Sequence, residues 1–120
     1  MISLVMIPLL LSGARGQQLT AVLSNGNSMP LIGLGVGNLA YERIAPAIRE
    51  AEAKHGVSLL DTAAASRNEH LILEGLAGAA RPGSVQVLTK VWYTHLGYAR
   101  TQWAVRDSLA KLRADNTGGG

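Results

Sequence analysis

The segment Pro30-Leu-Ile-Gly-Leu-Gly-Val-Gly37 sets the architecture of the chain. A short apolar run that becomes glycine-rich at its end is typical of a buried strand that opens into a loop. Helical spacing follows over residues 44–54, where one face carries Ile44, Ala47, Ile48 and Ala51. Pro46 suits the first turn of this helix, and Gly56 stands where a left-handed residue would end it. We therefore predict a strand followed by a helix.

The same order of strand and helix recurs twice towards the C-terminus. The next strands are predicted at Val57-Ser-Leu-Leu-Asp61 and Val85-Gln-Val-Leu-Thr-Lys90-Val91. Between them, Asn68 is suited to cap a helix that Arg81-Pro-Gly83 ends. Its predicted buried stripe is Leu71, Ile72, Gly75, Leu76 and Ala79. A third helix is predicted from Tyr98, with Tyr98, Val105, Leu109 and Leu112 buried. Strands that alternate with helices of this length form right-handed parallel crossovers, so the predicted class is α/β.

A hairpin is predicted upstream of these units. The segment 18–24 alternates weakly and is followed by Asn25-Gly26, the strongest short hairpin signal. Residues 1–17 hold an apolar run that is too short to cross a bilayer, for which about 20 residues are needed. The run resembles a secretory signal with Ala14-Arg15-Gly16 before the cleavage point, and the alternative is an N-terminal extension. We expect a secreted or ER-lumen protein in the first case and a cytoplasmic one in the second.

Composition excludes several classes of function. The chain has 120 residues, of which 48% are hydrophobic and 16% charged, which fits one small globular domain with a glycine-rich tail at 115–120. It has no cysteine, so a disulfide framework, a thiolate zinc site and a cysteine nucleophile are excluded, and we expect no metal site. The net charge of +3 is too small and too scattered to indicate nucleic-acid binding.

Three candidate site features follow the predicted strands. They are the Gly33-x-Gly35-x-Gly37 loop, Asp61 and Lys90. Ligands of open α/β sheets gather at the carboxyl ends of the strands. A dinucleotide-binding half-domain is one interpretation, but Asn38 stands where its third glycine would be, and no helix begins directly on the loop. A flexible connection between strand and helix is the simpler alternative for these glycines.

A second interpretation comes from three motifs in a fixed order. They are Asn25-Gly-Asn-Ser-Met-Pro-Leu-Ile-Gly-Leu-Gly-Val-Gly37, Leu60-Asp-Thr-Ala-Ala-Ala-Ser-Arg-Asn-Glu69 and Val87-Leu-Thr-Lys-Val-Trp92. Together they resemble the N-terminal third of the aldo-keto reductase family, over about residues 19–112. The resemblance implies an incomplete TIM (β/α)8 barrel, made of the hairpin and the first three βα units, over residues 18–114. It also implies NAD(P)H-dependent reduction of a small-molecule aldehyde or ketone to an alcohol, with NADPH or, less often, NADH.

The resemblance assigns roles to individual residues. Gly35, Val36 and Gly37 match the loop on the nicotinamide side, although Gly37 replaces a bulky residue of the family. Asp61 and Lys90 match the catalytic aspartate and lysine, and Asp61 also lies on the cofactor side. In the family, the lysine lowers the pKa of a tyrosine that supplies a proton to the reduced carbonyl.

Several positions depart from this pattern. Ser66 stands where the catalytic tyrosine is expected, and Arg67 replaces a glycine. The family's catalytic histidine, at the end of strand four, falls beyond residue 120. Tyr93 or His95 is a candidate for the missing proton donor, and the alternative is that both only shape the pocket rim. We expect Trp92 to line the substrate pocket and Trp103 to pack against the buried side of the third helix. His55 and His70 are expected on the surfaces of helices.

Length leaves three functions open. A complete barrel needs about 250 residues, so three strands leave two open edges and a marginally stable unit. The chain is an N-terminal fragment of a carbonyl reductase that is inactive alone, a non-catalytic remnant that binds nucleotide or a protein partner, or an exported interaction protein. Oligomeric state, substrate identity and the choice between NADPH and NADH do not follow from these residues.

Overall fold

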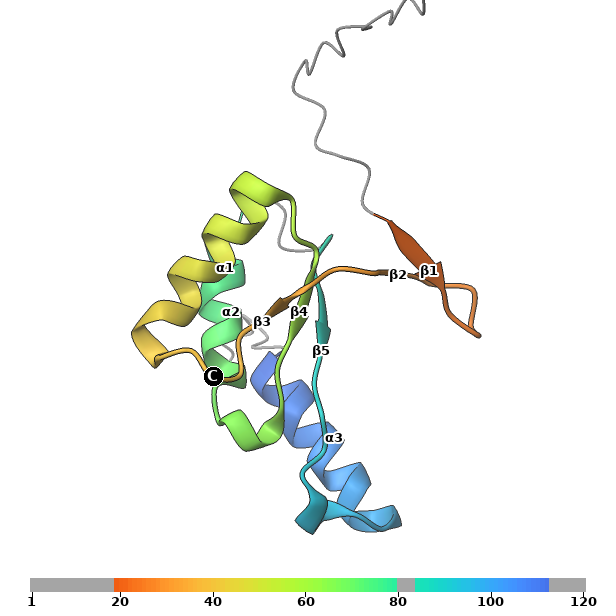
Figure 1. Ribbon diagram of the computed structural model, residues 1–120. Helices are drawn as coiled ribbons and strands as arrows, with labels where there is room; N and C mark the ends of the chain where they lie inside the picture. The colour runs from red at the N-terminus through yellow and green to blue at the C-terminus, as the bar shows by residue number, and fades with distance from the viewer. Residues whose placement is uncertain (1–18, 80–83, 113–120) are drawn as a thin grey trace, which may run out of the picture.

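The computed structural model describes residues 19–79 and 84–112, which form a hairpin followed by three strand–helix units (Figure 1). The strands are β1 (Thr20–Val22), β2 (Ser28–Pro30), β3 (Leu34–Gly35), β4 (Leu59–Asp61) and β5 (Gln86–Leu88). The helices are α1 (Tyr41–His55), α2 (Glu69–Ala77) and α3 (Tyr98–Leu112), with short 3-10 helices η1 (Ala64–Ser66) and η3 (Tyr93–His95). The parallel sheet has the order β3-β4-β5, which confirms the predicted α/β class.

Some predictions concern segments for which the structure gives no description. The proposed signal peptide at 1–17, the helix stop at Arg81-Pro-Gly83 and the glycine-rich tail at 115–120 all lie outside the described residues. Within the described ranges, no helix combines the length and the apolar character needed to cross a membrane.

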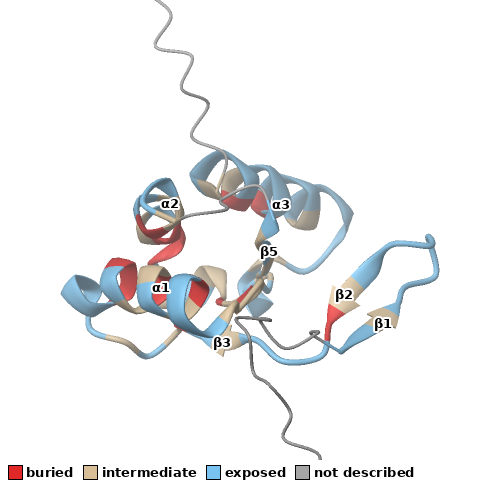
Figure 2. Ribbon diagram, turned by 90° about the horizontal axis from the view of Figure 1, so that it is seen from above, coloured by how far each residue is buried: buried red, intermediate tan, exposed pale blue. Residues whose placement is uncertain are grey.

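The predicted hairpin is confirmed, and it lies apart from the helices (Figure 2). β1 and β2 pair antiparallel, and Gly26 has a φ of 83°, a left-handed conformation that favours glycine in the turn. Leu23 N–H donates to the Asn27 carbonyl at 2.7 Å and closes the loop. Gln86 Nε2 donates to the Ser28 carbonyl at 2.8 Å, so the hairpin contacts the amino end of β5, away from the carboxyl edge of the sheet.

The prediction of a buried strand over 30–37 is only partly correct. The strand β3 has two residues, and Leu31 and Ile32 before it are 57% and 68% exposed. Helices α1 and α2 lie to one side of the three strands (Figure 2), and no second layer among the described residues covers the other side. Gly33 marks a close approach, because a Cβ there would lie 2.8 Å from the Leu59 carbonyl oxygen.

The core lies between the sheet and the first two helices. It consists of Val36, Ile44, Ile48, Leu60 and Ile72. Helix α2 packs closely on α1 at Gly75, where a Cβ would lie 2.9 Å from Ile48 Cδ1.

Two predicted details of α1 differ: its buried residues are Ile44, Ala45, Ile48 and Glu52, and Pro46 lies inside the helix. The helix starts at Tyr41, three residues before the predicted start, so Pro46 falls inside it. Pro46 lies on the exposed face, where the helix tolerates it at the loss of one backbone hydrogen bond. Gly56 ends the helix with φ 65°, as predicted.

Of the predicted buried face of α3, only Leu112 packs against the core. Tyr98, Val105 and Leu109 are 83%, 44% and 38% exposed, and the buried residues of the helix are Ala104 and Ser108. Val105 and Leu109 instead border an apolar hollow of about 160 Å³ beside β5, which Val87, Val91 and Leu112 also line. β5 is an edge strand of the described sheet, so no further strand among the described residues covers this hollow.

Candidate active site

The candidate residues collect at the carboxyl edge of the parallel sheet. Gly35 pairs with Asp61 in register, and Asp61 pairs with Leu88, so the three strands end at the same level. The three following loops begin here, and they carry the residues that the sequence analysis selected. The structure thereby brings the glycine loop, Asp61 and the segment that contains Lys90 to one edge.

Asp61 and Lys90 form an ion pair at this edge. Lys90 Nζ donates to Asp61 Oδ1 and, at 3.0 Å, to the carbonyl oxygen of Thr62. The Lys90 side chain is 55% exposed and the Asp61 side chain 43%, so both remain accessible to a small molecule. An ammonium has three N–H donors, and the described residues occupy two of them on Lys90. A cation with a free donor therefore stands beside a carboxylate at the open end of the strands.

A buried hydrogen-bond chain holds the loops behind this ion pair. Thr62 Oγ1 donates to Asn68 Oδ1 at 2.7 Å, and Asn68 Nδ2 donates to the Val36 carbonyl at 2.9 Å. Thr62 also supplies the carbonyl that accepts from Lys90. The chain thus links the loops after β3 and β4 to the charged pair.

The predicted capping role of Asn68 is wrong. Asn68 does occupy the position before α2, but its side chain makes no capping hydrogen bond. It is 0% exposed, and its amide instead satisfies Thr62 and Val36, which are also buried and therefore need hydrogen-bond partners. The partners of the Asn68 side chain lie 6 and 32 residues earlier in the chain, beyond the reach of a local capping signal.

The glycine loop faces the site with its backbone. Gly35 is exposed, and a Cβ added there would meet nothing within 4 Å. Val36 is 0% exposed and belongs to the core, while its N–H donates to the Asp61 carbonyl at 2.9 Å. Gly37 lies beside Ser66, whose Oγ would be 3.1 Å from a Cβ at position 37. Two small residues therefore stand side by side in the loops that follow β3 and β4.

The loop after β5 carries the aromatic candidates. The rings of Trp92 and Tyr93 lie 4.7 Å apart at 54°, and Tyr93 is 67% exposed. His95 stacks on Trp103 at 5.3 Å and 18°, so Trp103 contacts this loop and is 57% exposed, contrary to its predicted role in packing. The structure brings neither Tyr93 nor His95 into hydrogen-bond contact with the ion pair among the described residues. The two remaining histidines are exposed on or beside their helices, as expected (His55 and His70).

A buried carboxylate joins the second and third units. Glu69, at the start of α2, is 1% exposed, and its Oε1 accepts from Thr89 Oγ1 at 2.7 Å. Lys111 Nζ of α3 lies 3.9 Å from its Oε2. Thr89 precedes Lys90 directly, so this contact fixes the backbone from which the site lysine extends. No local motif predicts this pairing, because the partners are 20 and 42 residues away.

Comparison with known proteins identifies relatives for this arrangement. No family model matches the sequence. An aldo-keto reductase of Mycolicibacterium vanbaalenii is 38% identical over 97 residues, which are 80% of this chain and 34% of that protein. Methylglyoxal reductase of Escherichia coli K12 is 38% identical over 98 residues, 78% of this chain and 33% of that protein. The chain therefore spans about a third of the length of the curated relatives it matches.

Solved structures show the same relationship. An aldo/keto reductase of Brucella melitensis superposes with a TM-score of 0.71 at 31% identity, covering 80% of this chain and 38% of that one. An aldo-keto reductase of Bombyx mori in complex with NADP superposes with a TM-score of 0.68 at 28% identity, covering 80% of this chain and 34% of that one. The described fold is thus a part of a TIM barrel, as predicted.

Proposed function

We propose that the chain, which is 38% identical to an aldo-keto reductase over 34% of that protein's length, forms the nicotinamide-side part of an NAD(P)H-dependent carbonyl reductase. The ion pair of Lys90 and Asp61 at the carboxyl edge of the sheet is the observation that carries this proposal. The substrate class is a small aldehyde or ketone, as the name of the methylglyoxal reductase suggests. Catalysis by this chain alone is not expected, because three strands supply only part of a closed pocket.

The described residues fit one end of the cofactor. Gly35 leaves open space at the edge of the sheet, directly in register with Asp61, so a flat ring can approach the backbone there. NADPH or NADH, when bound, supplies the hydride for carbonyl reduction. Gly35, Gly37 and the backbone of Val36 would border its nicotinamide end, while the Val36 side chain stays in the core.

Lys90 is proposed to stabilise the negative charge that forms on the carbonyl oxygen. Its position is fixed by Asp61 and by the Thr62 carbonyl, and one ammonium N–H remains for a substrate oxygen. A serine hydroxyl is a much weaker acid than a tyrosine, whose ordinary pKa is about 10, so Ser66 does not replace the family's acid. The proton then comes from water held at Lys90 or from Tyr93 or His95 across the pocket mouth.

A non-catalytic protein that binds nucleotide or a protein partner is the second candidate. Ser66 favours it, because the position of the family's proton donor carries no comparable acid. Export as an interaction protein depends on residues 1–17 and gains no support from the described residues.

A chimeric enzyme tests the proposal. Residues 19–112 would replace the aligned segment of the Escherichia coli methylglyoxal reductase, and NADPH consumption with methylglyoxal would be measured. We expect weak turnover that rises with Ser66→Tyr, because a phenol is a much stronger acid than a serine hydroxyl, and that disappears with Lys90→Met. A folded chimera that binds NADPH but stays inactive with and without Ser66→Tyr would refute the reductase and favour the non-catalytic candidate.

A further inference from the structure

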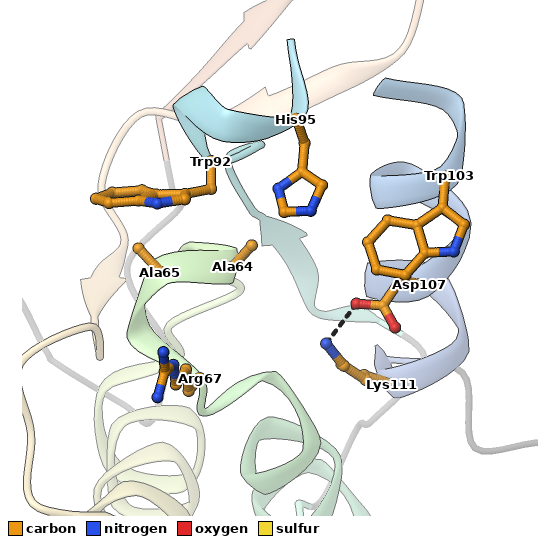
Figure 3. Close-up of a pocket in the computed structure, with 8 residues that line it drawn as sticks. All are labelled: Ala64, Ala65, Arg67, Trp92, His95, Trp103, Asp107 and Lys111. Carbon is orange, nitrogen blue, oxygen red and sulfur yellow. Dashed lines mark hydrogen bonds and ion pairs between the residues drawn. The ribbon is translucent and has the colours of Figure 1, made fainter. Parts of the chain in front are cut away.

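A second hollow, of about 490 Å³, lies between η1 and α3 (Figure 3). Its volume falls within the range of about 300–1,000 Å³ that is usual for small-molecule sites. Besides two alanines of η1, its lining consists of Arg67, Trp92, His95, Trp103, Asp107 and Lys111. All of them belong to two consecutive strand–helix units, and neither Asp61 nor Lys90 is among them. The hollow therefore does not contain the ion pair of the proposed reductase site, although it shares Trp92 and His95 with the expected mouth of the substrate pocket.

Aromatic rings form much of its wall. The imidazole of His95 and the indole of Trp103 lie nearly parallel, 5.3 Å apart, and both point into the hollow (Figure 3). The indole of Trp92 lies along the opposite side, next to Ala65. The two tryptophans are 44% and 57% exposed, so each offers an open ring face. Such faces bind flat aromatic molecules well, because stacking adds to the burial of apolar area.

The charges of the hollow do not cancel. Lys111 forms an ion pair with Asp107, one turn away on the same helix, and these two charges neutralise each other. Arg67 makes no ion pair or side-chain hydrogen bond with any of the described residues, and its side chain is exposed. An unpaired guanidinium is a planar fork of donors that matches a carboxylate with two parallel hydrogen bonds.

The backbone of Arg67 supplies a further observation. Arg67 has φ 52° and is the one non-glycine residue with a positive φ in the part of the chain that the structure describes. Glycine would adopt this left-handed conformation at lower cost. Residues held in such a conformation cluster at binding sites, where the strained backbone places a side chain that takes part in binding. Here the strained residue is also the unpaired cation of the hollow.

We propose that this hollow binds a planar aromatic carboxylate. The carboxylate accepts hydrogen bonds from the Arg67 guanidinium, and the ring lies against the indoles of Trp92 and Trp103. A cationic ligand is disfavoured because Asp107 is already paired with Lys111. An anion without a ring gains only the exposed contact with Arg67, which is weak in water.

Binding of 2-naphthoate to the full chain tests the proposal. Tryptophan fluorescence and the indole N–H signals of a ¹H–¹⁵N NMR spectrum would report the titration. Two probes separate the parts of the ligand: 2-naphthamide has the ring without the charge, and acetate has the charge without the ring. We expect saturable binding of 2-naphthoate and affinities at least about tenfold lower for the other two, since one charged hydrogen-bond pair accounts for that factor. Equal binding of 2-naphthamide and 2-naphthoate would overturn the assignment of the carboxylate.

Substitution of Arg67 separates binding from folding. Arg67→Gly relieves the backbone strain, so the melting temperature is expected to stay the same or to rise, while 2-naphthoate affinity falls at least about tenfold. Arg67→Lys keeps the charge without the fork and is expected to lie between the two. Arg106→Gln on the exposed part of α3, outside the hollow, is the matched control and should bind normally. A folded Arg67→Gly protein with unchanged affinity would show that Arg67 is not the carboxylate partner.

Discussion

Removal of the Asn68 side chain should destabilise the protein far more than its small volume suggests. In Asn68→Ala, the Thr62 hydroxyl loses its buried acceptor at 2.7 Å, which costs about 1–3 kcal/mol. The Val36 carbonyl loses its donor at 2.9 Å but keeps a long contact with the Leu39 N–H at 3.4 Å, so its cost is near the lower end, about 1 kcal/mol. The expected loss in the free energy of unfolding is therefore about 2–4 kcal/mol. That is a large part of the total for a small domain.

Urea denaturation followed by circular dichroism measures this loss. Asn25→Ala is the matched control, because its side chain makes one exposed hydrogen bond, to the Asn27 N–H, and its loss should stay within about 0.5 kcal/mol. Thr62→Val removes the donor of the same contact while keeping the Thr62 carbonyl for Lys90, and about 1–3 kcal/mol is expected. In the double variant Thr62→Val/Asn68→Ala, the loss of unfolding free energy should be about 1 kcal/mol smaller than the sum of the two single losses, because both substitutions remove the same hydrogen bond. Additive losses, or a loss for Asn68→Ala no larger than that of Asn25→Ala, would refute the buried chain of hydrogen bonds.

Three further predictions concern the helices. Gly75→Ala places a Cβ 2.9 Å from Ile48 Cδ1 and should lower the unfolding free energy by about 1–3 kcal/mol in the same urea assay; an unchanged midpoint would mean that α1 and α2 pack less closely. Gly56→Ala forces a side chain into φ 65° and should cost about 1 kcal/mol, whereas Gly56→Asn should cost less. Lys54 lowers the pKa of the Glu50 carboxyl by a hydrogen bond and by its charge, so the stabilisation is present above the ordinary pKa of Glu50 and is lost as the pH falls through the lowered pKa. An NMR titration should show that lowered value and its return towards normal in Lys54→Met.

Local sequence signals predicted the elements well because they act over a few residues. The Asn25-Gly26 turn, the left-handed Gly56 and the alternation of strand and helix all appear in the structure. The side-by-side position of Asp61 and Lys90 followed from the rule that parallel strands end at one edge of a sheet. The burial of α3 did not follow, because periodicity shows only that a helix has an apolar face. Val105 and Leu109 stay 44% and 38% exposed beside β5, the edge strand of the described sheet.

The site shows the same division between local and distant information. Asn68 was correctly placed at the start of a helix, but its hydrogen bonds go to a residue 32 positions earlier and to one 6 positions earlier. The left-handed conformation of Arg67 is rare for arginine, and its one sign in the sequence was the resemblance, which places a glycine at this position. Trp103 and His95 became neighbours only when α3 folded back beside the loop after β5.

The amino-acid order fixed the class, the succession of units and the edge at which chemistry is possible, because turns, caps and strand periodicity are encoded within a few residues. The folded structure decided which side chains are buried, which polar groups pair and where hollows form. These properties depend on contacts between segments tens of residues apart, such as Thr89 with Glu69 and Lys111 with Glu69, and their geometry is set only when the layers pack. For this chain, the reductase-like ion pair was foreseeable from its motifs, whereas the hollow beside Arg67 came from packing alone.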